Sequence, residues 1–209
     1  MKEQAKPTIS SSETARLCSE SGGGCMIGSA QGREMDWRPV IRHYRRRHLP
    51  NHRAEVQWFQ GRPTLGAAIE KAALAEDHRG KRYSHQRRIC RDALNSAFER
   101  LRSSGEAIRN CQSFDELHEL IVSILKNIRG IGELYCYDTT LRIGAKLGHQ
   151  PQTVFLHAGT RVGASALVDT RGKRYLTAVD LPPELRRLPP EQVEDILCIY
   201  KSRIKGLRR

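Results

Sequence analysis

The residues best suited to chemistry in this chain form a glycine-containing turn at residues 127–133, Asn-Ile-Arg-Gly-Ile-Gly-Glu. Apolar residues with helical spacing lie on both sides of it. Gly130 and Gly132 flank Ile131, so the backbone can turn sharply and expose its N–H groups at the start of the second helix, where the helix dipole is positive. The pattern predicts a binding place for a phosphate oxygen at Gly130, Ile131 and Gly132, with Arg129 beside it.

The same segment resembles the helix-hairpin-helix DNA-binding superfamily. Its hairpin reads apolar-x-Gly-apolar-Gly, followed four residues later by a small residue that packs on the first helix. Ile128, Gly130, Ile131, Gly132 and Cys136 match this pattern in order. The resemblance covers residues 113–147 and implies sequence-tolerant binding to a phosphate backbone. The alternative is a helical hairpin that only connects two packed helices.

The chain departs from that family just after the second glycine. Many members place a lysine there, whereas this chain has Glu133 and Leu134. Neutralisation of phosphate charge is therefore expected from other cations, or these cations form an ordinary solvated surface. The candidates are Arg129, Lys146, Arg87, Arg88 and Arg91.

Residues 137–142, Tyr-Asp-Thr-Thr-Leu-Arg, are more distantly similar to the helix-hairpin-helix DNA glycosylases, in which an Asp heading such a stretch supports attack at a sugar carbon. In that family the Asp follows the hairpin by a helix and a loop, whereas Asp138 falls inside the helix directly after Gly132. The resemblance implies Asp138 as a candidate catalytic residue and Arg142 as a candidate phosphate contact. Pairing of Asp138 with Arg142 at i, i+4 is the simpler expectation.

A second polar cluster spans residues 157–163, His-Ala-Gly-Thr-Arg-Val-Gly. Gly159 and Thr160 could form another anion-binding turn, with Arg161 holding a phosphate through both guanidinium arms. His157 joins Asp138 as a candidate catalytic residue. The alternative is a loop in which Thr160 caps a helix and no ligand binds.

The net charge of +13 is unevenly distributed along the chain. Residues 36–103 hold 16 Lys and Arg against 7 Asp and Glu, and residues 201–209 hold 5 against none. Residues 113–147 hold 4 against 5. Localised basicity favours a polyanionic partner, and the resemblance favours DNA over RNA. The basic segments 42–47, 79–91 and 201–209 are expected to share the contacts.

The elements that must position these residues are helical, and the fold expected is all-α or mostly α. A single helical domain is predicted over residues 34–209, behind a disordered tail at 1–33, which has serine and glycine runs but no apolar periodicity. Ser113 and Glu116 predict a capping box, Thr64 a helix cap, Ser84 a helix over 84–103, and Pro190 the start of the last helix. Residues 154–156 fit a strand or a helical turn, and residues 170–173 a small hairpin turn.

Other classes of function lack their motifs. The 6 cysteines include no C-x-x-C pair, the 8 histidines show no H-E-x-x-H, and no nucleotide-binding glycine loop or serine-hydrolase elbow is present. We expect no metal, no cofactor and a cytoplasmic location. No apolar run reaches the roughly 20 residues that cross a bilayer, so no membrane partner is expected. The oligomeric state stays open.

Three classes of function follow. The first is a nucleic-acid-binding helical protein that contacts the phosphate backbone. The second is an enzyme acting on nucleic acid, with Asp138, His157 and Arg161 around a cleft. The third is a helical protein-interaction module. An exposed hairpin beside basic residues would favour the first class, and polar residues gathered around a pocket would favour the second.

Overall fold

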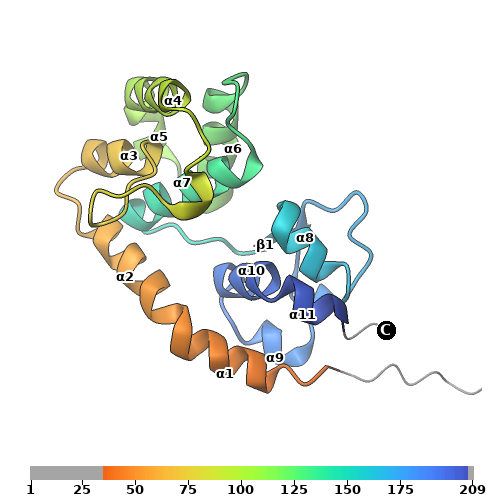
Figure 1. The fold of residues 1–209 in the computed structure, drawn as a ribbon. Helices are drawn as coiled ribbons and strands as arrows, with labels where there is room; N and C mark the ends of the chain where they lie inside the picture. The colour runs from red at the N-terminus through yellow and green to blue at the C-terminus, as the bar shows by residue number, and fades with distance from the viewer. Residues whose placement is uncertain (1–34, 207–209) are drawn as a thin grey trace, which may run out of the picture. The chain divides into compact units, whose positions relative to one another are not determined.

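A computed structural model describes residues 35–206 and shows the expected mostly helical fold (Figure 1). The predicted tail 1–33 and the last basic residues, 207–209, lie outside the described residues. The helices are α1 (Arg38–Arg47), α2 (Leu49–Gln60), α3 (Leu65–Ala73), α4 (Arg91–Ser103), α5 (Gly105–Asn110), α6 (Phe114–Leu125), α7 (Glu133–Leu147), α8 (Ala158–Ala164), α9 (Pro183–Arg186), α10 (Pro190–Ile199) and α11 (Lys201–Gly206). Short 3₁₀ turns are η1 (Ser84–Gln86) and η2 (Ala178–Asp180), and the strands are β1 (Val154–Phe155) and β2 (Tyr175–Leu176).

Two helix starts form as predicted. The Thr64 hydroxyl accepts a hydrogen bond from the Ala67 N–H at 3.1 Å, and the Ser113 hydroxyl accepts one from the Glu116 N–H at 3.1 Å. The predicted capping box differs in one hydrogen bond. The Glu116 carboxylate accepts from the N–H of Gln112, the residue before the cap, at 2.8 Å, instead of from the N–H of Ser113. These side chains satisfy amides that a helix start leaves unpaired.

The prediction of a helix that begins at Ser84 is wrong for the first turns. Residues 84–86 form η1, and α4 begins only at Arg91, because Cys90 is extended at φ −66° and ψ 154°. The Gln86 side chain is buried and bonded to Asp138 and Arg142, which holds this segment against α7. Arg87 and Arg88 therefore lie in a turn rather than on a helix face.

The small sheet also differs from the expectation of a local hairpin at residues 170–173. That turn forms, with the Lys173 N–H donating to the Thr170 carbonyl at 3.3 Å. It leads into β2, which pairs antiparallel with the distant β1, Val154 opposite Leu176. The apolar run at 154–156 is therefore buried and contains strand β1. Along the chain, helix α8 comes between β1 and its partner strand β2.

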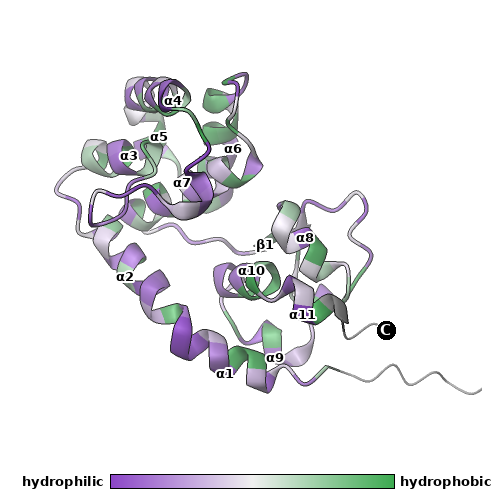
Figure 2. Ribbon diagram, viewed as in Figure 1, coloured by the Kyte–Doolittle hydropathy of each residue, from purple (hydrophilic) through white to green (hydrophobic). Residues whose placement is uncertain are grey.

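Two hydrophobic cores lie within one compact unit, Arg33–Arg209. The first joins the helices from α2 to α7 and includes Leu94, Leu117 and Ile121. The second joins α1, the strands and the helices from α8 onward, and includes Trp37 and Ile196. Figure 2 shows that α1 and α2 are hydrophilic along most of their length. Within the described residues, no helix is both long and apolar enough to span a membrane.

Candidate functional site

Residues 126–132, called the hairpin below, connect α6 to α7. The Ile128 N–H donates to the Leu125 carbonyl at 3.2 Å, and the Ile131 N–H donates to the Ile128 carbonyl at 3.1 Å. Asn127 and Gly130 have positive φ, +69° and +92°. Ile128 is buried, whereas Gly130 is exposed, so the apolar residue anchors a turn whose tip faces solvent.

The two glycines of the hairpin differ in what they require. Gly130 lies in the left-handed region, which favours glycine. Gly132 is extended, with φ −117° and ψ 179°, a conformation open to any residue. Of the two glycines, only Gly130 therefore has a backbone conformation that favours glycine. A Cβ built on either glycine meets no atom within 4 Å, so open space lies beside both.

The start of α7 faces a hollow of about 320 Å³. Gly132 is the N-cap, no side chain caps the helix, and the first intrahelical bond runs from the Cys136 N–H to the Gly132 carbonyl at 3.1 Å. The amides of the first turn precede that bond and point out of the helix. Lys126, Arg174 and Glu133 line the hollow, so two cationic side chains and one carboxylate lie near these amides.

Arg100, which the sequence patterns did not single out, anchors the hairpin. Its Nη1 donates to the carbonyls of Ile124 at 3.2 Å and Lys126 at 3.1 Å. These carbonyls belong to the last turn of α6, which has no intrahelical donors for them. An arginine on a neighbouring helix leaves no signal in local spacing, because its partner lies 24 residues away.

Of the predicted basic contacts, four remain available at the surface. Arg87, Arg88, Arg91 and Arg129 are exposed. Arg129 lies within the hairpin itself. The other three lie in the turn before α4 and at its first residue.

Arg142 and Lys146 are not available to a phosphate, contrary to expectation. Arg142 is 4% exposed; its guanidinium donates to Glu55 at 3.0 Å and to Gln86 at 3.1 Å, and lies 3.8 Å from the centre of the Tyr83 ring. The Lys146 ammonium donates to the carbonyls of Gln60 and Arg62, just at and beyond the end of α2. Both cations stabilise the contact of α7 with α2 and η1.

Thr160 and Arg161 likewise have internal roles, and the proposed second anion-binding turn is not open. Thr160 is buried and its hydroxyl donates to Glu194 at 2.8 Å. The Arg161 guanidinium donates to the carbonyls of Leu156, Thr170 and Lys173 at 2.8–2.9 Å. A guanidinium with three carbonyl partners holds the loop between α8 and β2 in place. The helix cap is His157, whose Nδ1 accepts from the Gly159 N–H, and not Thr160.

Asp138 lines a cavity of about 510 Å³ formed by α2, α7 and α10. Its carboxylate accepts hydrogen bonds from Gln86 at 2.7 Å and contacts the His85 Nε2 at 2.7 Å. The expected ion pair with Arg142 is present at 3.8 Å. Asp138 is thus both paired within the fold and open to the cavity.

The opposite wall of the cavity carries the carboxylates of Glu191, Glu194 and Asp195 on α10. Burial, together with the charge of Glu194, raises the pKa of Asp195 to about 7. The Tyr44 hydroxyl donates to Asp195 at 2.7 Å, and His52 lies 3.5 Å away. One carboxylate oxygen of Glu191 is buried without a hydrogen-bond partner among the described residues. This wall is suited to a ligand that donates hydrogen bonds.

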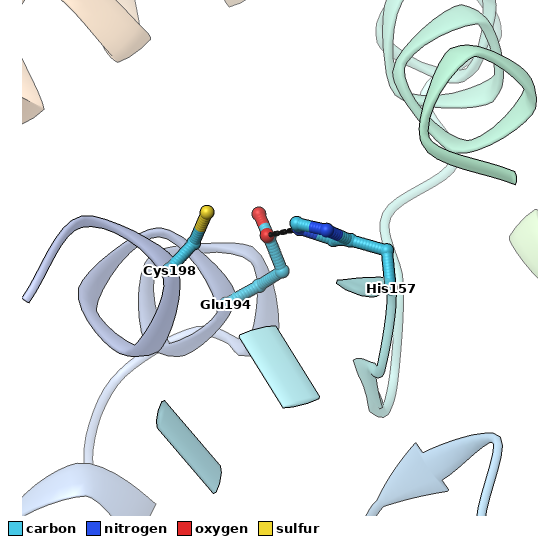
Figure 3. A group of neighbouring side chains, drawn as sticks. All are labelled: His157, Glu194 and Cys198. Atoms are coloured by element: carbon cyan, nitrogen blue, oxygen red, sulfur yellow. Dashed lines mark hydrogen bonds and ion pairs between the residues drawn. The ribbon is translucent and has the colours of Figure 1, made fainter. Parts of the chain in front are cut away.

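His157 lies behind this wall rather than in the cavity. It is 3% exposed, and its Nε2 contacts the carboxylate of Glu194, a residue that also lines the cavity. Cys198 lies one helical turn after Glu194 and completes a group of three ligand-type side chains (Figure 3). The sequence patterns missed Glu194 and Cys198, although their i, i+4 spacing on α10 places both on one face.

Asp138 and Arg142 therefore meet at the cavity, while His157 reaches it only through Glu194, and Arg161 faces other elements. Comparison of the chain with family models, with curated proteins and with solved structures finds no match.

Proposed function

We propose that this protein binds the phosphate backbone of nucleic acid, DNA in preference to RNA and without strong sequence dependence, through the hairpin. The main support is the hairpin's geometry: an exposed turn with open space at Gly130 and Gly132 leads into the uncapped amides of a 15-residue helix. A phosphate oxygen at this position would receive hydrogen bonds from amides that have no partner within the helix.

Nearby cations support the same function. Lys126 and Arg174 line the hollow at the start of α7, and Arg129 is exposed within the hairpin. Arg87, Arg88 and Arg91 provide a second exposed basic group. Glu133 is the unfavourable residue, since an exposed carboxylate at the first position of α7 repels a phosphate.

The test uses Gly132→Val. Because Gly132 is extended and its Cβ position is empty, valine fits without strain and blocks only the close approach of a ligand. Binding of a fluorescently labelled duplex should weaken about tenfold, equivalent to roughly 1.4 kcal/mol. Gly105→Val is the matched control, because Gly105 also lies at a helix start with no atom within 4 Å of its Cβ and no positive φ.

Both variants must keep the wild-type circular dichroism spectrum and melting temperature. Equal binding by Gly132→Val and wild type would show that the hairpin is only a connector. Binding that needs Arg87 and Arg91 but not the hairpin would move the contact surface to the turn before α4. No binding at low salt would remove the nucleic-acid function and favour a protein partner.

A second candidate function is an enzyme that acts on nucleic acid in the cavity. Asp138 follows Gly132 by six residues on α7, a rise of about 9 Å along the helix axis. A strand held at the hairpin would therefore lie within a few nucleotides of a cavity that is lined by Asp138, His85 and the carboxylates of α10. A cavity of about 510 Å³ has room for a nucleoside.

Asp138→Asn tests this candidate. The variant keeps an oxygen that can accept from Gln86 but loses the charge. Product formation from labelled duplexes carrying modified bases should fall at least a hundredfold while binding stays within about twofold. Unchanged product formation would discard Asp138 as a catalytic residue, and absence of any product from wild type would leave the binding function alone.

A further inference from the structure

A cluster of nitrogen, oxygen and sulfur donors is built where α8 packs against α10. The ligand atoms of His157, Glu194 and Cys198 all lie within 4.8 Å of one another (Figure 3). His157 and Glu194 are 3% and 7% exposed, and Cys198 is half-buried. The Thr160 hydroxyl lies beside them, 2.6 Å from the His157 Nε2 and 2.8 Å from the Glu194 Oε1.

Tight helix packing positions the cluster. A Cβ on Gly163 would lie 2.1 Å from the Leu197 carbonyl oxygen, and one on Gly159 would lie 2.7 Å from the Cys198 Sγ. Only glycine therefore fits at position 163, where the neighbour is backbone, whereas at position 159 the neighbours are side-chain atoms of the cluster itself. The close approach brings the start of α8 against the Glu194 and Cys198 face of α10. The donors are held by backbone packing before any ligand arrives.

The charge of the cluster suits a divalent cation. A carboxylate and a thiolate together supply two negative charges, and imidazole adds a neutral nitrogen. In the described part of the chain, Glu194 is hydrogen-bonded by His157 and Thr160 and by no lysine or arginine. Mixed imidazole, carboxylate and thiolate ligands favour zinc over magnesium or calcium, which prefer oxygen ligands.

We propose that His157, Glu194 and Cys198 bind one Zn²⁺ ion per chain, with the fourth position taken by water or by the Thr160 hydroxyl. Binding releases the Cys198 thiol proton to solvent. The imidazole proton moves from Nε2, which faces Glu194, to Nδ1, so that Nε2 can coordinate the metal. Nδ1 then no longer accepts from the Gly159 N–H, a bond of 3.1 Å in this structure. The ion would tie the N-terminus of α8 to α10.

Co²⁺ and Zn²⁺ titrations of the full chain under reducing conditions test the site. Co²⁺ should give a sulfur-to-metal charge-transfer band at one equivalent, Zn²⁺ should displace it, and the Gly159 amide resonance should shift. Cys198→Ser should abolish the band, and Glu194→Gln and His157→Asn should weaken Zn²⁺ binding at least about tenfold. Asparagine can still cap α8, so this variant removes the ligand while keeping the helix start.

The control Cys90→Ser removes an exposed cysteine outside the cluster and should bind Zn²⁺ like wild type. A second control replaces Cys18 and Cys25, which lie outside the described residues. A charge-transfer band that persists in Cys198→Ser would overturn the site. So would a Zn²⁺ affinity of the wild type that is no higher than the Zn²⁺ affinity of Cys198→Ser. The cobalt spectrum of the wild type is decisive even if a variant unfolds, because absence of a thiolate band disproves coordination by Cys198.

Discussion

At the scale of single residues, burial separates charges that serve the fold from charges that face solvent. Arg142 and Arg129 both belong to the predicted phosphate-contacting set. Arg142 is enclosed by Glu55, Gln86 and the Tyr83 ring, whereas Arg129 is exposed. A buried guanidinium must be paired, since the desolvation of an isolated charge costs several kcal/mol. Arg142 therefore stabilises the wall of the cavity.

Arg142→Met should lower the free energy of unfolding by about 2 kcal/mol or more, because it leaves Glu55 and Asp138 without their cation. Part of that cost is screened, since the Glu55 side chain is 36% exposed. Arg91→Met, at an exposed position, should change stability by less than about 0.5 kcal/mol. Urea unfolding measures both, and equal effects would contradict a structural role for Arg142.

His118 provides a pH-dependent contribution to stability. Burial lowers its pKa from 6.5 to about 4, with a smaller effect from the charge of Arg174. Between pH 6.5 and pH 4 the unfolded chain binds a proton at this residue that the folded chain does not. The free energy of unfolding should therefore fall as the pH falls through this window, by about 2 kcal/mol at pH 5 from this residue alone.

His118→Asn removes the titration and can still donate to the Thr140 hydroxyl, which His118 contacts at 3.0 Å. Urea unfolding at pH 7.5 and pH 5 should show a smaller loss of stability for this variant than for wild type. The same loss in both proteins would mean that His118 is not responsible.

At the scale of elements, glycines shape the hairpin and the close contact between α8 and α10, and the two proposals rest on these features. In the hairpin, Gly130 is required by its backbone conformation, whereas Gly132 has an extended backbone that any residue can adopt. Between α8 and α10, Gly163 is required by contact with the Leu197 backbone. Each requirement has a different physical origin and a different expected cost.

Gly130→Ala should lower the free energy of unfolding by about 1 kcal/mol, because alanine is strained at φ +92°. Gly132→Ala should cost almost nothing, since its backbone is extended. Thermal melts of the two variants separate the effects. A cost at Gly132 as large as that at Gly130 would contradict the geometry of the hairpin.

Gly163→Ala should be far more damaging, lowering the free energy of unfolding by about 3 kcal/mol or preventing folding, because the new Cβ would overlap the Leu197 carbonyl. Gly66→Ala on α3 is the matched control, since the only neighbour of its Cβ is the Thr64 hydroxyl at 3.8 Å. That change should be neutral or stabilising. Expression level and melting temperature report the difference, and a well-folded Gly163→Ala protein would show that α8 and α10 pack less closely.

At the scale of the whole molecule, the net charge of +13 and the hairpin are expected to make separable contributions to the proposed nucleic-acid binding. Charge acts by releasing counterions and sets the slope of affinity against salt. Backbone amides carry no net charge and change affinity without changing that slope. Salt dependence therefore distinguishes the two even when the overall losses of affinity are similar.

Affinity for a labelled duplex, measured at several salt concentrations, should fall steeply as salt rises. Arg129→Ala and Arg87→Ala should each reduce the slope by about one phosphate contact. Gly132→Val should lower affinity at every salt concentration and leave the slope unchanged. A flat salt response of the wild type would contradict backbone binding, and an altered slope in Gly132→Val would contradict the role of the amides.

The mostly helical fold, the caps at Thr64 and Ser113 and the turn between α6 and α7 could be predicted from the sequence, because caps and apolar periodicity act over a few residues. Which polar side chains remain accessible to a ligand could not be predicted in this way, because it depends on contacts between distant elements. Arg142, Lys146, Thr160 and Arg161 are engaged by partners from other elements or loops, and Glu194 and Cys198 meet His157 across a gap of about 40 residues. Spacing along a chain reports which face of a helix a residue occupies, but what packs against that face depends on the long-range contacts of the fold.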